Sequence, residues 1–146
     1  MHLQQRTDYA IRLLIHLAVD RSGPRPVGDI ARGFDISEHH LAKVAQRLRE
    51  LGYLSTIRGR NGGFELALDP ASIRLGDLVR QLEEMTIVEC FDRAQNRCAI
   101  TGACLLRGVL ERARASFLAV LDEHTLEDLV GPRRADLAQV LDIRPR

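Results

Sequence analysis

The chain has 146 residues, a length that suits one domain with at most a small appendage. Apolar residues make up 45% and charged residues 28% of the sequence, and these proportions exclude a disordered or collagen-like chain. No apolar stretch approaches ~20 residues, the length of a membrane-spanning helix, and the first residues lack the apolar segment of a signal peptide. We therefore expect a cytoplasmic protein with no membrane partner.

The formal net charge is only +1, but basic and acidic side chains are unevenly distributed along the chain. Residues 1–68 carry an excess of Lys and Arg, and residues 69–146 carry an excess of Asp and Glu. Between His39 and Arg60 the only acidic residue is Glu50. A basic segment of this kind is typical of phosphate binding, although a solvated helix face explains the charge equally well.

The first half of the sequence predicts a helix, a short helix, a turn and a further helix. Apolar residues at one-face spacing indicate the first helix, which ends near Asp20, ahead of the breaker sequence Ser22-Gly23-Pro24. A short helix is expected from about Val27 to Arg32. The helix after it is expected to have Ser37 as its N-cap and to end at Gly52.

Two short β-prone runs follow, at residues 53–57 and 64–68, with Asn61-Gly62 between them. An Asn-Gly pair between such runs is typical of a β-hairpin. The order of elements therefore predicts a helix-turn-helix followed by a basic hairpin wing. In this arrangement the second helix of the motif enters the major groove of double-stranded DNA, and the wing contacts an adjacent groove. The predicted DNA-contacting residues are Ser37, His39, His40, Lys43 and Arg47 on the helix and Arg58, Arg60, Asn61, Gly62 and Gly63 on the wing.

The second half predicts an amphipathic helix at about residues 75–84, an irregular segment, and a long amphipathic helix at residues 105–121. The apolar stripe of the long helix is wide, which favours packing against a second copy of the chain. Packing within the core of one chain is the alternative. Thr125 is the expected N-cap of a short helix through Val130, and residues 131–146 are expected to be a weakly ordered tail.

All three cysteines, Cys90, Cys98 and Cys104, fall in the irregular segment. An odd number of cysteines in a cytoplasmic chain argues against a disulfide framework. Thiolates bind zinc, Cu(I) and iron–sulfur clusters, so this group indicates a soft-metal site that is one protein ligand short. The closely spaced cysteine pairs of zinc sites are absent, which favours an iron–sulfur cluster; zinc and redox-active or structural thiols are the alternatives.

Together these elements predict a mainly α fold. It consists of a winged helix-turn-helix with a two-stranded β wing, a cluster-binding loop and a long C-terminal dimerisation helix. We divide the chain into a DNA-binding domain at residues 1–84, the iron–sulfur cluster loop at residues 85–104, a dimerisation helix with a following short helix at residues 105–130, and the tail at residues 131–146.

Three short motifs resemble one family of bacterial regulators. They are Thr7-Asp8-Tyr9-Ala10, Arg58-Gly59-Arg60-Asn61-Gly62-Gly63-Phe64 and Val88-Glu89-Cys90-Phe91-Asp92. From about Met1 to Val130 the chain resembles the Rrf-type winged-helix regulators, which include the iron–sulfur regulator IscR and the iron-responsive regulator RirA. The cysteine spacing and Asp8 are most similar to the nitric-oxide-sensing iron–sulfur repressors of this family, the NsrR type.

The resemblance implies a homodimer formed through the long helix, with a cluster on the three cysteines. The cluster implied is 4Fe-4S, and 2Fe-2S is the alternative. The resemblance also implies that Asp8 supplies the fourth ligand across the dimer. An ion pair with Arg12, or stabilisation of the helix N-terminus, is the other interpretation of Asp8. His16 and His124 are alternative donors.

The function implied by the resemblance is transcriptional repression by a dimer bound to a palindromic operator. Release follows when nitric oxide nitrosylates the cluster. The alternative on the same fold is a regulator of the RirA or IscR kind, which responds to iron or cluster status. A family member that binds DNA without a cluster is a further alternative. A zinc- or thiol-dependent redox enzyme is disfavoured, because the sequence has no Cys-x-x-Cys pair and no base–nucleophile arrangement, so we expect no enzymatic activity.

Overall fold

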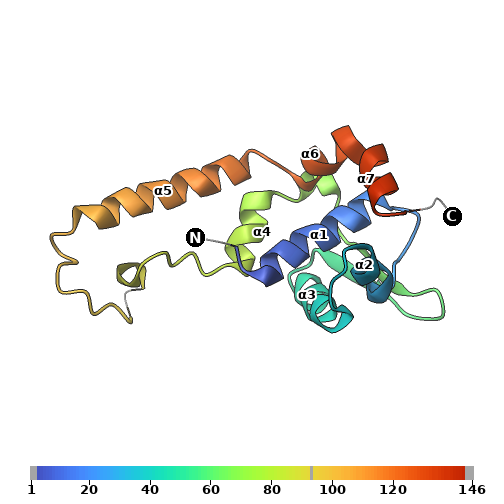
Figure 1. The fold of residues 1–146 in the computed structure, drawn as a ribbon, viewed down its shortest axis with the longest axis horizontal. Coiled ribbons are helices and arrows are strands. Elements are labelled where there is room, and N and C mark those ends of the chain that lie inside the picture. Colours follow the sequence, from blue (N-terminus) through green and yellow to red (C-terminus); the bar gives the residue numbers. More distant parts are fainter. Residues whose placement is uncertain (1–2, 93, 144–146) are drawn as a thin grey trace.

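Helix α1 (Gln5–Val19) lies at the centre of the larger part of the fold, and a long helix, α5, extends away from that part (Figure 1). The structure is a computed structural model that describes residues 3–92 and 94–143. The other elements in chain order are α2 (Val27–Gly33), α3 (Glu38–Glu50), β1 (Leu54–Ile57), β2 (Gly63–Leu66), the 3₁₀ turn η1 (Pro70–Ser72), α4 (Leu75–Leu82), η2 (Glu89–Phe91), α5 (Leu105–Asp122), α6 (Leu126–Val130), η3 (Gly131–Arg133) and α7 (Arg134–Val140).

The inner face of α1 forms the centre of the hydrophobic core, as the apolar spacing predicts. Leu13 and Leu14 are fully buried, and Leu17 is almost so. Because the apolar side chains recur on one side of the helix, α1 can pack against α3, α6 and β2 together. We call residues 5–82 and 126–140, which share this core, the body. Its order of elements confirms the predicted winged helix-turn-helix.

Helices α2 and α3 form the predicted helix-turn-helix, and both predicted caps of α3 are present. The Ser37 side chain accepts a hydrogen bond from the backbone N–H of His40 at 3.5 Å. At the other end, Gly52 has a φ of +84°, and the N–H of Tyr53 donates to the carbonyl of Leu48 at 2.9 Å. Glycine ends helices in this way because it adopts a positive φ without strain.

Strands β1 and β2 form the predicted hairpin, paired antiparallel with Ile57 opposite Gly63. The turn differs from the expected Asn61-Gly62 turn. A two-residue turn of that kind has a positive φ at both of its central residues. Within the hairpin the positive φ angles belong to Gly59 and Gly63 instead, at +117° and +154°, so a longer loop joins the strands.

Arg25 joins the base of the hairpin to the body. Its N–H and carbonyl exchange hydrogen bonds with the carbonyl and N–H of Phe64, each 2.9 Å long, so Arg25 forms a β-bridge beside β2. Its guanidinium pairs with the carboxylate of Asp20 at the end of α1, and both side chains are largely buried. Backbone and side-chain contacts therefore fix the wing to the end of the central helix.

Helix α5 lies outside the body. None of its residues is buried, and Leu105 and Leu106 are 87% and 59% exposed. Its end is tied to α4, where the Arg80 guanidinium donates two hydrogen bonds of 2.6 Å to the Asp122 carboxylate. Figure 1 shows the segment between α4 and α5 running out to the far end of α5. We call residues 83–122 the arm; among its described residues none is buried.

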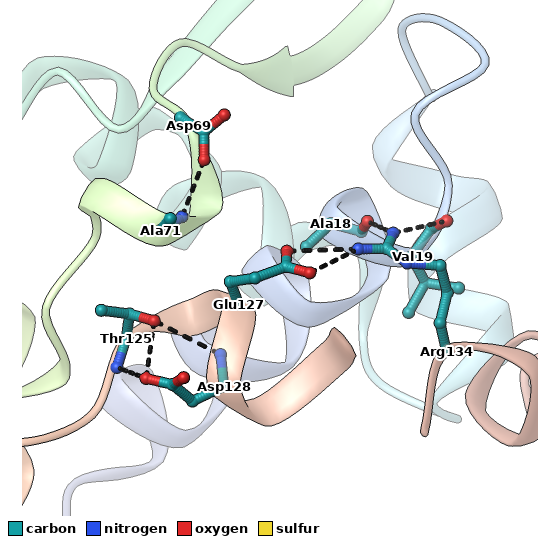
Figure 2. Close-up of polar contacts among 8 residues, drawn as sticks. All are labelled: Ala18, Val19, Asp69, Ala71, Thr125, Glu127, Asp128 and Arg134. Atoms are coloured by element: carbon teal, nitrogen blue, oxygen red, sulfur yellow. Dashed lines mark hydrogen bonds and ion pairs between the residues drawn. The ribbon is translucent and has the colours of Figure 1, made fainter. Parts of the chain in front are cut away.

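The expectation of a weakly ordered tail is wrong for the described residues 131–143, which continue the helical body. Helix α6 begins at the predicted cap: the N–H of Thr125 donates to the Asp128 carboxylate at 2.7 Å. In α7, which follows, Arg134 donates to the carbonyl of Ala18 and to the Glu127 carboxylate (Figure 2). The sequence expectation missed this order because the contact joins residues far apart in the chain.

Other boundaries differ slightly from the expected ones. Helix α4 ends at Leu82 rather than near Glu84, and α5 extends to Asp122. The last part of the predicted tail, residues 144–146, lies outside the described residues. Among the helices of the described part, none is long and apolar enough to cross a membrane.

Candidate DNA interface and cysteine segment

The outer face of α3 presents the basic residues that are predicted to contact DNA. His39, His40, Lys43 and Arg47 are exposed, because the apolar residues between them face the core. Lys43 has no ion-pair partner among the described residues, whereas Arg47 forms an exposed ion pair within the helix. Ser37 is also exposed, but its side chain serves as the N-cap. The helix thus offers a row of exposed basic side chains of the kind that contacts phosphates.

The wing tip contains exposed side chains and also glycines that the hairpin backbone requires. Gly62 and Gly63 are half-buried. A Cβ atom on Gly63 would lie 2.2 Å from the carbonyl oxygen of Arg25, so only glycine permits the close approach of the wing to the body. The DNA contacts of the wing remain predictions. The exposed residues at the tip are Arg58, Arg60 and Asn61.

A groove of about 710 Å³ lies beside α3. Its two walls are α3 and the first turns of α1. The end of α4 and the start of the arm also line it. Arg6 and Arg80 are not among the predicted DNA-contacting residues, because neither belongs to α3 or to the wing. The lining side chains are Gln5, Arg6 and Tyr9 of α1, His40, Lys43, Val44 and Arg47 of α3, and Arg80, Gln81, Leu82, Glu83 and Glu84.

The three cysteines are free and are spread along the arm. Cys98 is exposed, whereas Cys90, in η2, and Cys104, at the N-cap of α5, are half-buried. Within residues 3–92 and 94–143, no three His, Cys, Asp or Glu side chains form a group that could hold a metal ion. The single chain therefore does not gather its three thiols into one site.

Short-range hydrogen bonds shape the segment around Cys98. The N–H of Cys98 donates to the side-chain oxygen of Asn96 at 3.0 Å, and the Thr101 hydroxyl donates to the Cys98 carbonyl at 2.8 Å. These contacts join residues close in sequence, so they order the loop locally without fixing it to the body.

Near Cys90, one side chain of α5 holds the arm together. The Arg114 guanidinium lies 4.7 Å from the ring centroid of Phe91 and donates to the carbonyl of Met85 at 3.3 Å. A cation over an aromatic ring is an attractive contact. Arg114 therefore connects α5 to η2 and to the residues that precede η2.

Asp8 takes part in the ion pair that its spacing allows. Its carboxylate lies 2.7 Å from the Arg12 guanidinium one turn later, and it is 45% exposed. The alternative donor His16 is 6% exposed among core side chains, where burial lowers its pKa. The other alternative, His124, follows the far end of α5, about 27 Å along the helix from Cys104. The geometry thus favours neither histidine as a partner of the cysteines.

The sequence matches the family model Rrf2, described as an iron-dependent transcriptional regulator, over residues 3–132. It is 45% identical to the HTH-type transcriptional regulator NsrR of Bacillus subtilis (strain 168) and 47% identical to the regulator of that name from Geobacillus kaustophilus, in each case over 99% of both chains. The fold is similar to that of CymR (YrzC), the global cysteine regulator of B. subtilis, with a TM-score of 0.71 and 30% identity over 90% of this chain and 97% of that one. The chain therefore belongs to the Rrf2 family of iron-dependent transcriptional regulators.

Proposed function

We propose that this chain is a DNA-binding transcriptional repressor that senses nitric oxide through an iron–sulfur cluster. As a homodimer it binds a palindromic operator with α3 and the wing, and nitric oxide releases it. The observation that carries the proposal is the set of three free cysteines in one segment of a chain that matches regulators named NsrR over nearly its whole length. In this proposal residues 1–84 bind DNA, residues 85–104 bind the cluster and residues 105–130 form the dimer.

The donor chemistry of the cysteine segment fits an iron–sulfur cluster. Thiolates are the usual protein ligands of such clusters, and none of the three thiols is held in a disulfide or in the core. The hydrogen bonds around Cys98 are local, so the loop can close around a cluster while the body keeps its packing. Cys90, Cys98 and Cys104 would then hold a 4Fe-4S cluster, with 2Fe-2S as the alternative.

The fourth ligand in this proposal is Asp8 of the partner subunit. Its carboxylate is 45% exposed and, among the described residues, is paired only with Arg12, a contact that solvent weakens. A carboxylate is a harder ligand than a thiolate, so it makes this position of the cluster more labile. When bound, the cluster supplies iron ions that nitric oxide can bind.

The exposed face of α5 supports the proposed homodimer. Leu105, Leu106, Val109 and Val120 of this helix are between 49% and 87% exposed. Burying such a face against an identical helix is favourable by about 25 cal/mol per Å² of apolar surface. Two-fold symmetry also matches a palindromic operator. We therefore assign the dimer interface to α5.

Helix α1 connects the proposed cluster ligands to the DNA-reading helix. It carries Asp8, and it packs directly against α3. At its start, the N–H of Gln4 donates to the carboxylate of Glu83, at the beginning of the arm, at 2.7 Å. Release of Asp8 and of the arm frees this end of α1 to shift and to move α3. A tenfold loss of operator affinity requires only about 1.4 kcal/mol of such coupling.

An anaerobic purification tests the cofactor and the signal together. We expect about four iron and four sulfide ions per chain and tight binding to the DNA sequence that the protein selects from a random library. A few equivalents of nitric oxide per cluster should bleach the absorbance and release this DNA. Cys98→Ser should abolish both properties. Gln95→Ala, an exposed change in the same segment, is the control and should retain them. DNA binding that persists after nitric oxide has removed the cluster spectrum would contradict the proposal.

A second candidate is a regulator that responds to iron or cluster status. The description of the matched family as iron-dependent favours it. Two measurements distinguish the two functions: iron chelation without nitric oxide, and addition of nitric oxide at levels that leave the iron content unchanged. An iron-status regulator loses its DNA under chelation and keeps it at nitric oxide levels that leave the iron content unchanged.

A further inference from the structure

The groove beside α3 points to a DNA contact surface wider than α3 and the wing. We infer that one phosphodiester strand of the operator lies over this groove, where Arg6 of α1 binds its phosphates together with Lys43 of α3. The inference rests on the proposed DNA-binding function and adds α1 to the interface.

Arg6 and Lys43 stand on the two walls of the same groove, which has a volume of about 710 Å³. Both side chains are exposed, and neither forms an ion pair among the described residues. Each therefore has its donors free for a phosphate. His40 and Arg47 continue the basic row along the α3 wall. Exposed cations with free donors, as Arg6 and Lys43 are, form the arrangement that follows a nucleic-acid backbone.

The other charged side chains of the groove limit the region in which a phosphate can bind. The Glu83 carboxylate accepts a hydrogen bond from the N–H of Gln4, and Arg80 is paired with Asp122. Glu84 also lines this part of the groove. The acidic groups would repel a phosphate, and the paired Arg80 has few donors left to bind one. The strand is therefore confined to the part of the groove between Arg6 and the α3 wall.

Helix geometry gives this contact a direct connection to the proposed cluster. Arg6 and Asp8 are two residues apart, which is about 200° around an α-helix, so they point to nearly opposite sides of α1. One helical turn then carries a cation toward the DNA and a proposed cluster ligand away from it. A shift of this turn moves the Arg6 contact itself, in addition to any movement of α3.

A salt titration of DNA binding tests the inference. We compare Arg6→Gln with Arg133→Gln, since each change removes one exposed positive charge and Arg133 lies in η3, outside the groove lining. Arg6→Gln should weaken binding about three- to tenfold for both the selected operator and an unrelated duplex, because a phosphate contact carries no sequence information. The slope of log K against log salt concentration should fall by about 1.8, because the dimer loses one phosphate contact, worth about 0.9, in each subunit. Arg6→Lys should keep the slope, and Arg133→Gln should behave as wild type.

An unchanged slope in Arg6→Gln would overturn the inference. So would an equal loss in both glutamine variants, because net charge alone would then explain it. Arg60→Ala in the same titration distinguishes failure of the α1 contact from failure of the proposed DNA-binding function. If Arg60→Ala weakens binding while Arg6→Gln does not, only the extension to α1 fails. If the cluster-loaded wild-type protein binds no DNA, the proposed function itself fails. Circular dichroism of each variant verifies that the fold is intact.

Discussion

Arg134 closes the C-terminal end of α1. Figure 2 shows its guanidinium between the carbonyl oxygens of Ala18 and Val19 on one side and the Glu127 carboxylate on the other. The last carbonyls of a helix have no partner within the helix, and they form its negative end. A cation that donates to them satisfies these acceptors and also offsets the dipole. One side chain thus holds the C-terminal segment against the central helix.

Replacing Arg134 should destabilise the whole body. We expect Arg134→Ala to lower the free energy of unfolding by about 1–2 kcal/mol, measured by urea denaturation, because the α1 carbonyls and Glu127 lose their shared donor. The value stays in this range because the Arg134 side chain is 38% exposed, so water replaces part of the interaction. Arg133→Ala removes a neighbouring exposed arginine and should change stability by less than about 0.5 kcal/mol. Similar losses in the two variants would show that the loss of one positive charge, rather than loss of the cap, explains the effect.

The residues that sequence reasoning placed correctly act on their immediate neighbours. Ser37 and Gly52 cap a helix through backbone groups a few residues away, so their type and position were sufficient to predict them. Arg25 and Arg134 contact groups that are close in space but far along the chain. Their partners therefore depend on how the whole backbone folds. The cysteine site remains a prediction for a related reason: one of its proposed donors belongs to another chain.

The observed elements agree with the predicted ones where the apolar periodicity of the sequence is strong. The stripes of α1, α3 and α4 predicted their helices, and the β-prone runs predicted the hairpin. The turn of the hairpin differed, since Gly59 and Gly63 rather than the Asn-Gly pair take the positive φ angles. Helix α7 was missed because its pattern is weak and its order comes from contact with the end of α1. Tertiary contact decides such short elements.

Helix α5 provides the clearest test at the scale of an element. Val109 is 49% exposed on its apolar face, and Ala115 is exposed on another side of the same helix. Val109→Glu would place two like charges near the two-fold axis of the proposed dimer, at a cost of several kcal/mol. We expect sedimentation at micromolar concentration to show a dimer for wild type and for Ala115→Glu, and a monomer for Val109→Glu. A dimer in all three proteins would place the interface elsewhere.

At the scale of the whole molecule, one buried histidine makes the stability of the body depend on pH. His16 faces Phe34, and Asp20, Arg25 and Asp29 lie within its electrostatic surroundings. Burial is the main influence and lowers the pKa of His16 below its ordinary value of 6.5; the two carboxylates raise it and Arg25 lowers it further. The folded state therefore binds this proton at lower pH than the unfolded state does.

This difference predicts a loss of stability in mild acid. Below pH 6.5 the unfolded state binds the His16 proton first, so the free energy of unfolding decreases as the pH falls toward the folded-state pKa. Urea denaturation at pH 7 and pH 5 should show a larger decrease for wild type than for His16→Gln, which cannot take up this proton. An equal decrease in the two proteins would contradict the assignment.

The carboxylates with shifted pKa values do not interfere with that measurement. Hydrogen bonds from Arg80 lower the pKa of Asp122, and those from Thr125 lower the pKa of Asp128, both below the ordinary value of 3.8. Their stabilising contributions are present above that pH and disappear only in stronger acid. The interval from pH 5 to pH 7 therefore excludes the titration of these two carboxylates.

The attachment of the wing through Arg25 also bears on how operator preference can evolve. Because the base of the hairpin is fixed to the body by the backbone pairing of Arg25 with Phe64, the exposed residues Arg58, Arg60 and Asn61 at its tip are not needed to hold it in place. Doubling the length of such a loop costs only about 0.6 kcal/mol of closure entropy. Tip sequences can therefore be lengthened or exchanged between relatives with little loss of stability. Under the proposed function, operator specificity can diversify at the tip while Gly62 and Gly63 behind it stay constant.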